Sequence, residues 1–164
     1  MSVAFVKEES AEAASETVIG ERPISPYPNL VSEAGFRQLE SNLQAALAAC
    51  EAAEKIEDIN ERRRQSALPL RDARYFAARV RSARIVEAPT TNDVVAFGTT
   101  VTFRRKDGRV QTYRVVGEDE ADPSSGTVSH TSPIVRMMMG KSVGETAGTG
   151  QQEVEIVAIA IAAH

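Results

Sequence analysis

The chain has 164 residues, of which 42% are hydrophobic and 26% charged, so it can form one ordinary domain or two small ones and is not generally disordered. A formal net charge of −4 and an aromatic content of only 5% exclude a broad DNA-binding face and a base-stacking single-strand binder. The single cysteine, Cys50, cannot form an internal disulfide, which fits a reducing compartment. The most apolar run, Ile156–Ala163, is too short to span a bilayer, and no secretion signal is recognisable, so we expect a cytoplasmic protein.

Residues 1–29 are predicted to be a disordered or extended tail. Glutamates interleaved with serine and alanine, and three prolines near the end, make up its pattern: Glu8, Glu9, Glu12, Glu16, Glu21, Pro23, Pro26 and Pro28. Closely spaced prolines stop a helix and favour an extended chain. The alternative is that Ile24–Leu30 packs along the domain that follows.

An apolar heptad stripe after Ser32 predicts the first arm of a coiled coil. Its members are separated alternately by three and four residues: Phe36, Leu39, Leu43, Ala46, Cys50 and Ala53. This spacing places them on one seam of a helix. Ser32 is the expected N-cap of that helix. Cys50 is interpreted as a small buried side chain on the seam and not as a reactive thiol.

A second, less regular stripe predicts the returning arm of a helical hairpin. It consists of Leu70, Ala73, Ala77 and Val80, and arginines cover much of the remaining surface. Pro89 prevents the helix from continuing. Two such helices in succession are typical of an antiparallel coiled-coil hairpin, which we assign to residues 30–89.

After Thr90 the spacing becomes strand-like, which predicts a small sheet domain over residues 90–164. The expected strands are Val94–Phe97, Thr99–Phe103, Val110–Val116, Thr127–His130 and a last strand with Val154, Ile156, Ala158 and Ala160 on one face. Asp107-Gly108 marks a hairpin turn. The fold class is therefore α+β, in which a helical hairpin precedes a small antiparallel sheet that carries one short helix.

That short helix has both of its ends specified by sequence. Ser132 is placed to cap the amino end through its hydroxyl, and Pro133 suits the first helical position. Gly140 can take the left-handed conformation that ends a helix. The residues between them are mostly apolar, so one side of the helix is expected to pack on the sheet.

Three blocks of the sheet domain resemble one known family. Ser132–Glu145 follows the pattern Ser-Pro-x-x-Arg-x-(apolar)-(apolar)-Gly-Lys-x-Val-Gly-(acidic), and Val95–Thr102 and Val115–Asp122 precede it in matching order. Together they resemble the carboxy-terminal domain of the Gre family, the bacterial transcript cleavage factors GreA and GreB. The resemblance implies an FKBP-like sheet domain after an amino-terminal coiled-coil hairpin, although fold alone does not imply prolyl isomerase activity.

The resemblance also implies a partner and a docking segment. A Gre-like factor would bind RNA polymerase through the sheet domain and insert its hairpin into the secondary channel of the polymerase. The residues that match the docking segment of the family are Thr131, Ser132, Pro133, Arg136, Gly140 and Lys141. Thr131 stands where an acidic residue is common in the family. Nucleic acid would be reached only indirectly, through the polymerase, and we expect a monomer that does not bind membranes.

The hairpin turn is the candidate site of chemistry. In the Gre family the tip carries an Asp and, three residues later, a Glu, which help the polymerase to hold a second Mg²⁺. Asp58 and Glu61 match that spacing here, with Glu57 replacing a glycine and Arg62 an asparagine. The resemblance thus implies Mg²⁺ shared with the polymerase active site and no cofactor of the chain's own.

Two alternatives remain open for this turn. In the first, Glu57, Asp58 and Glu61 form an ordinary solvated turn. A rival alignment places the turn at Ser66–Pro69, because proline in a helix interior costs about 3 kcal/mol. The two arms are equal in length only when the turn lies near Asp58, which we therefore prefer.

We expect no enzymatic activity of the chain itself. The only histidines are His130 and His164, and no Cys/His metal cluster or glycine-rich phosphate loop is recognisable. The leading hypothesis is a Gre-type elongation factor that stimulates transcript cleavage or competes with factors that do. The alternative is an interaction module, independent of polymerase, that oligomerises through its hairpin.

Overall fold

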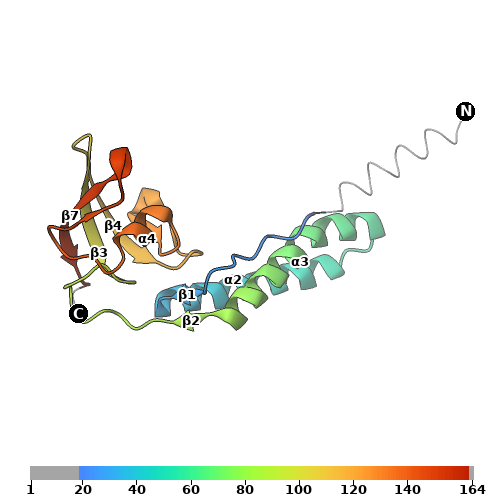
Figure 1. The fold of residues 1–164 in the computed structure, drawn as a ribbon. Coiled ribbons are helices and arrows are strands. Elements are labelled where there is room, and N and C mark those ends of the chain that lie inside the picture. Colours follow the sequence, from blue (N-terminus) through green and yellow to red (C-terminus); the bar gives the residue numbers. More distant parts are fainter. Residues whose placement is uncertain (1–18, 163–164) are drawn as a thin grey trace, which may run out of the picture. The chain divides into compact units, whose positions relative to one another are not determined.

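The structure, a computed structural model, describes residues 19–162, and Figure 1 shows its ribbon. The described chain divides into two compact units, a hairpin unit of residues 19–26 and 38–82 and a sheet unit of residues 27–37 and 83–162. The predicted α+β class is confirmed. The division does not follow the predicted boundaries at residues 29 and 89, because both chain segments beside those boundaries are paired within the sheet unit.

The hairpin consists of α2 (Glu33–Glu54) and α3 (Ile59–Ser82), joined by a short turn. Asp58 ends this turn, and its Oδ1 accepts a hydrogen bond from the Glu61 N–H at 2.8 Å, as an N-cap does. The turn therefore lies near Asp58, as predicted. The rival turn at Pro69 is wrong, because Pro69 lies inside α3.

The predicted seam of α2 is confirmed. Leu39, Ala46 and Ala53 are buried, and the other three members of the stripe are half-buried. The seam of α3 differs from the prediction at one position, because Leu70 is 44% exposed. The buried residues of α3 are Ala73 and Arg79, so the expectation that the arginines of this arm all cover its surface is wrong at Arg79, which is 1% exposed.

The segment before the hairpin runs along α3. Arg22 forms an ion pair with Asp72 at 3.4 Å, and its guanidinium lies 3.8 Å from the centre of the Tyr75 ring. Glu21 forms an ion pair with Arg74 at 2.6 Å. Glu21 and Arg22 of the predicted tail therefore pack on the hairpin, whereas residues 27–29 belong to the sheet unit, in line with the alternative for Ile24–Leu30. Residues 1–18 lie outside the described part.

Two short strands lie at the root of the hairpin. β1 (Leu30–Val31) pairs in parallel with β2 (Arg84–Ile85), and Val31 is buried. Backbone hydrogen bonds from Arg84 to Asn29 (2.8 Å) and from Val86 to Val31 (2.8 Å) extend the pairing. This pairing attaches residues 27–37 to the sheet unit.

The main sheet has five strands in the order β5-β4-β3-β7-β6. Their bounds are β3 (Thr100–Arg105), β4 (Val110–Val116), β5 (Thr127–Ser129), β6 (Thr146–Ala147) and β7 (Val154–Ala160). The Asp107-Gly108 turn between β3 and β4 is confirmed, with Gly108 at φ +88° and the Asp107 carboxylate accepting from the Arg109 N–H at 3.0 Å.

The sheet is mixed and not purely antiparallel as predicted. β5 pairs in parallel with β4, with Thr127 opposite Arg114. The reason is the connection between the two strands, which returns the chain to Arg114 of β4 before β5 begins, so that both strands run in the same direction. Asp122 caps a single 3-10 turn (Pro123–Ser125), and Gly126 at φ +82° then directs the chain into β5.

A bulge changes which residues of β7 face the core. β7 pairs with β3, and the register shifts so that Phe103 lies opposite Ile156 while Thr102 lies opposite Ala158. Val157 is the extra residue, and after it Ile159 is buried while Ala158 and Ala160 are exposed. The predicted alternation through Ala158 and Ala160 is therefore wrong beyond Ile156.

One helix, α4 (Pro133–Met138), covers the core of the sheet unit. The core contains Val95, Phe97, Val101, Phe103, Val115, Val135, Met138, Ala147, Val154, Ile156 and Ile159. The predicted strand Val94–Phe97 is not part of the sheet. Instead, Val95 exchanges backbone hydrogen bonds with Gly140 (2.8 Å) and Lys141 (2.9 Å), which fixes the chain that follows α4. None of the helices in residues 19–162 is long and apolar enough to cross a membrane.

Candidate functional site

The candidate docking segment begins at a turn fixed by hydroxyl groups. The Thr131 N–H donates to Ser129 Oγ at 3.0 Å, and the hydroxyls of these two residues lie 2.7 Å apart. Ser132 occupies the N-cap position of α4, but its side chain makes no capping hydrogen bond, and its Oγ is buried without a hydrogen-bond partner in the described structure. The expected hydroxyl cap is therefore wrong, because local turn geometry and Pro133 define this helix end.

The two sides of α4 separate core residues from exposed ones. Val135 and Met138 are buried, whereas Pro133, Arg136, Met139 and Gly140 are exposed. We call these four exposed residues the α4 face. Three of the predicted docking residues belong to it, namely Pro133, Arg136 and Gly140. The other three, Thr131, Ser132 and Lys141, are half-buried beside it.

The end of the α4 face is shaped by backbone geometry. Gly140 has φ +78°, a conformation that residues with a side chain rarely adopt, and its N–H donates to the Val95 carbonyl. The Lys141 side chain reaches Glu145 at 4.0 Å, an exposed pair that contributes little to stability. The sequence thus predicted this chain reversal correctly from Gly140.

Arg136 is the only cation of the α4 face, and it contacts a residue far away in sequence. Its Nη1 donates to the Tyr27 hydroxyl at 2.8 Å, and its guanidinium lies 5.2 Å from the centre of the Tyr27 ring. Both residues belong to the sheet unit. Sequence analysis missed Tyr27 because it falls in the predicted tail. The available signal was an aromatic residue between two prolines, Pro26 and Pro28, in an otherwise polar segment.

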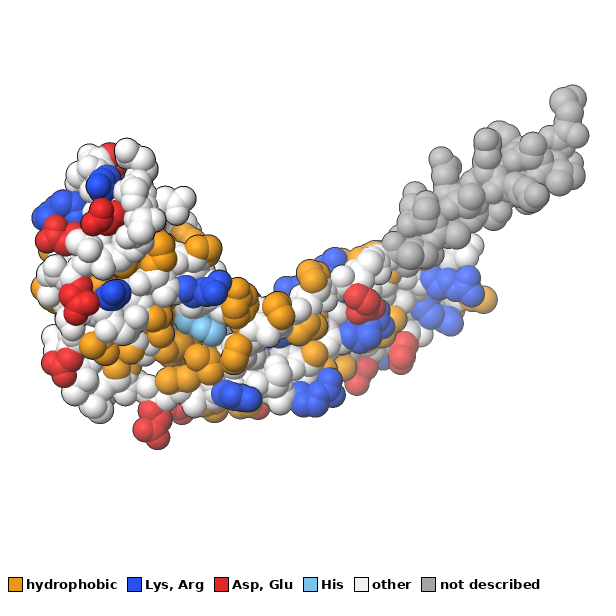
Figure 2. Space-filling view, viewed as in Figure 1, with side chains coloured by type: hydrophobic (Ala, Val, Ile, Leu, Met, Phe, Trp, Pro, Cys, Tyr) orange, Lys and Arg blue, Asp and Glu red, His pale blue; other side chains and the backbone are white. Residues whose placement is uncertain are grey.

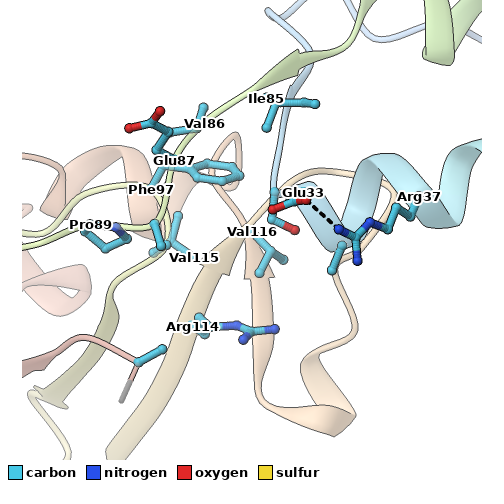
Figure 3. A pocket seen from close by; sticks show the side chains of 15 residues that line it. Glu33, Arg37, Ile85, Val86, Glu87, Pro89, Phe97, Arg114, Val115 and Val116 are labelled. Atoms are coloured by element: carbon cyan, nitrogen blue, oxygen red, sulfur yellow. Dashed lines mark hydrogen bonds and ion pairs between the residues drawn. The ribbon is translucent and has the colours of Figure 1, made fainter. Parts of the chain in front are cut away.

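One cavity of the sheet unit is lined mainly by apolar side chains. It has a volume of about 470 Å³, and its walls include Val86, Pro89, Phe97 and Val115. Figure 3 shows these side chains together with the ion pair between Glu33 and Arg37 in the first turn of α2. The lining contains no histidine or cysteine, so it offers no imidazole base or thiol for nucleophilic catalysis.

The carboxylates of the hairpin tip take part in the turn itself. Asp58 caps α3, as described above. The Glu61 carboxylate accepts hydrogen bonds from Arg64 and from Gln65 (2.9 Å). Arg62 closes the other side of the turn by donating from Nε to the Ile56 carbonyl at 2.7 Å and from Nη2 to the Glu57 carbonyl at 3.3 Å.

Two features of this arrangement weigh against a pair of Mg²⁺ ligands. Each of the two carboxylates already accepts hydrogen bonds, and Arg62, Arg63 and Arg64 add positive charge beside them. Figure 2 shows basic side chains gathered at this end of the hairpin, on the face in view. Within residues 19–162 no group of three His, Cys, Asp or Glu side chains is arranged to hold a metal ion.

Cys50 has the environment that its place on the heptad stripe predicts. It is half-buried on α2, and burial raises the pKa of its thiol, with a smaller contribution from Glu54. A raised pKa lowers the thiolate fraction at neutral pH and therefore the reactivity of the sulfur.

Comparison with known proteins matches the sheet unit. Residues 90–161 match the family model described as the carboxy-terminal domain of transcription elongation factor GreA/GreB. The GreA of Bacillus licheniformis is 44% identical over 68 residues, which are 40% of this chain and 43% of that protein. The GreA of Geobacillus kaustophilus is 42% identical over 87 residues, which are 49% of this chain and 54% of that protein. The chain thus spans about half the length of the curated relatives it matches.

Solved structures also align with this chain, at low identity. The GreA factor homolog 1 (Gfh1) of Thermus thermophilus is 20% identical with a TM-score of 0.37, and the alignment covers 81% of this chain and 99% of that one. The GreA/GreB elongation factor of Nitrosomonas europaea is 18% identical with a TM-score of 0.37, covering 82% and 98% of the two chains.

Proposed function

We propose that this chain, whose residues 90–161 match the carboxy-terminal domain of GreA/GreB, is a transcription elongation factor of that family and binds RNA polymerase. The α4 face supports this proposal most directly. It is the exposed side of the segment that matches the family signature, and it contains the exposed residues Pro133, Arg136 and Gly140.

Arg136 would provide the main polar contact with the polymerase. Its guanidinium contacts the neutral Tyr27 hydroxyl, and among residues 19–162 no carboxylate pairs with it, so its positive charge is not compensated within the described chain. An arginine of this kind binds a carboxylate through two parallel hydrogen bonds. The exposed Met139 would add apolar contact area beside it.

The hairpin would enter the secondary channel of the polymerase. Its helices contain 22 and 24 residues, which correspond to about 33 and 36 Å at 1.5 Å per residue. The tip would reach toward the active site with Asp58 and Glu61 hydrogen-bonded in the turn. We therefore propose that the protein occupies the channel and competes with transcript cleavage factors, and does not supply ligands for a second Mg²⁺.

The remaining expectations follow from this role. The chain would act as a monomer in the cytoplasm, would contact nucleic acid only through the polymerase, and would catalyse no reaction of its own. No cofactor would be required, since any Mg²⁺ involved would be the polymerase's own.

One observation favours a second candidate, an interaction module that oligomerises through the hairpin. One side of α2 carries small exposed side chains, namely Ala45, Ala48, Ala49 and Ala52. Small side chains permit close approach of another helix. Sedimentation over a range of protein concentrations tests this candidate, which requires a dimer or larger species.

A binding titration with matched variants tests the proposed function. Labelled wild-type protein is titrated with bacterial core RNA polymerase, alongside Arg136→Ala and the control Arg104→Ala. Arg104 is an exposed arginine of β3 whose only described ion pair is with Glu155 at 3.5 Å, so the control removes the same charge elsewhere. We expect wild type and R104A to bind alike and R136A to bind at least tenfold more weakly. Absence of wild-type binding would contradict the proposal.

A further inference from the structure

The segment that precedes the hairpin places Tyr27 beside the α4 face. Tyr27 lies against Arg136 through both a hydrogen bond of 2.8 Å and a cation–π contact of 5.2 Å to the ring centre. Tyr27 is itself 42% exposed, so the pair is accessible from solvent. This segment lies outside residues 90–161, the part of the chain that matches the family model.

The position of Tyr27 is fixed by its neighbours in the chain. The Leu30 N–H donates to the Pro28 carbonyl at 3.0 Å, and the Arg84 N–H donates to the Asn29 carbonyl at 2.8 Å. Asn29 is only 4% exposed, and Val31 is buried. Tyr27 is therefore attached to the β1–β2 pairing, two residues before a buried part of the sheet unit begins.

Contact with a fixed tyrosine restricts the orientation of the Arg136 side chain. An isolated arginine on a short exposed helix samples many rotamers, and ordering them when a partner binds costs free energy. The Tyr27 hydroxyl uses one of the five N–H donors of the guanidinium and leaves the others for a partner. Because that hydroxyl is neutral, it orients Arg136 without neutralising the charge.

We infer that Tyr27 is a positioning residue for polymerase docking, which holds the Arg136 guanidinium in one orientation so that it binds a carboxylate on the polymerase surface. The inference rests on the proposed function. It assigns a role to the amino-terminal segment of this chain, which forms part of the docking surface together with the α4 face.

A double-mutant cycle tests this role. The affinity for core RNA polymerase is measured for wild type, Tyr27→Phe and Tyr27→Ala, each with Arg136 present and with Arg136→Ala. We expect Y27A to bind about two- to tenfold more weakly than wild type, as the ordering cost of one long side chain implies. Y27F, which keeps the ring and loses the hydroxyl, should lie between them. In the R136A background Y27A should cause no further loss.

Two results would overturn the inference in this cycle. An equal loss from Y27A with and without Arg136 would mean that Tyr27 acts independently of Arg136. Unchanged or tighter binding by Y27A would mean that Tyr27 does not prepare Arg136 for its partner. Thermal unfolding of each variant serves as the check that the fold is retained.

A second readout separates this inference from the proposed function. NMR relaxation of the Nε–H group measures the mobility of the Arg136 side chain in the free protein. We expect the group to be ordered in wild type and mobile in Y27A. An Arg136 that stays as ordered in Y27A as in wild type contradicts the positioning role, whether or not the protein binds polymerase. An ordered wild-type Arg136 with no polymerase binding contradicts the proposed function instead.

Discussion

Glu120 binds Ser32 through both of its carboxylate oxygens. Oε2 accepts from the Ser32 N–H at 3.2 Å, and Oε1 accepts from the Ser32 hydroxyl. Oε2 also accepts from the Gly117 N–H at 3.2 Å. Ser32 Oγ in turn accepts from the Gly35 N–H at 3.0 Å, so the predicted N-cap of α2 is confirmed. One carboxylate from the loop after β4 thus holds the first turn of α2 in the sheet unit.

Removal of this carboxylate should destabilise the protein. Glu120→Ala leaves two N–H donors and one hydroxyl without their charged acceptor, and hydrogen bonds to charged groups contribute about 1.5–3 kcal/mol each. We expect the free energy of unfolding of the sheet unit to fall by about 2 to 4 kcal/mol. Chemical denaturation measures it, with the exposed Glu145→Ala as a control that should change stability by less than about 0.5 kcal/mol. Equal stability of E120A and wild type would contradict this assignment.

Replacement of Gly35 by alanine should destabilise the protein, although glycine-to-alanine changes usually stabilise helices. Gly→Ala within a helix normally stabilises by up to about 1 kcal/mol. Here a Cβ on Gly35 would overlap the carboxyl group of Glu120. We expect G35A to be destabilising in the wild-type chain and neutral or stabilising in the E120A background, where the obstacle is absent. Denaturation of both pairs checks the sign, and a stabilising G35A in the wild-type chain would refute the contact.

The pH dependence of the segment before the hairpin follows from Glu21. The hydrogen bond from Arg74 is the main cause that lowers the pKa of the Glu21 carboxyl. A pKa lowered in the folded state gives a contribution that is present above the unfolded value and is lost as pH falls through the folded value. We expect this contact to break in acid. In an NMR titration, the Glu21 transition of the wild type should lie at lower pH than the Glu21 transition of the Arg74→Ala variant. Coincident titration curves would contradict the contact.

Two substitutions of Asp58 distinguish a structural role of its carboxylate from a role as a metal ligand. Asp58→Asn keeps an oxygen that can cap α3, whereas Asp58→Ala removes it and should lower the free energy of unfolding by about 1 kcal/mol. Asparagine is a much weaker Mg²⁺ ligand than aspartate. If the carboxylate serves only the turn, D58N behaves as wild type in stability and in competition for the polymerase. Loss of an RNA cleavage activity in D58N would identify Asp58 as a metal ligand instead.

Sequence reasoning succeeded where one local pattern determines the structure. The heptad spacing of Leu39, Ala46 and Ala53 predicted the buried seam of α2, because the period of an α-helix fixes which residues share a face. The left-handed glycine at Gly140 was likewise predictable, since few other residues adopt that conformation. Asp107-Gly108 determined its hairpin turn for the same reason.

It failed where distant parts of the chain decide the outcome. The bulge at Val157 turns Ile159 inward, and it depends on the pairing of β7 with β3. Tyr27 reaches Arg136 across 109 positions, a contact that no local spacing encodes. At Ser132 the residue type favours a cap, but the hydroxyl is buried in a turn already fixed by Ser129 and Thr131.

The most direct test of the central claim is transcript cleavage in a stalled elongation complex to which an authentic GreA factor is added. We expect that this protein alone causes no cleavage, that it blocks cleavage by GreA in a concentration-dependent way, and that R136A blocks at least tenfold less well than R104A. A failure of the wild type to block would contradict docking on the polymerase. Cleavage by the wild type alone that disappears in the Asp58→Ala/Glu61→Ala double mutant would contradict the assignment of the tip carboxylates to the turn.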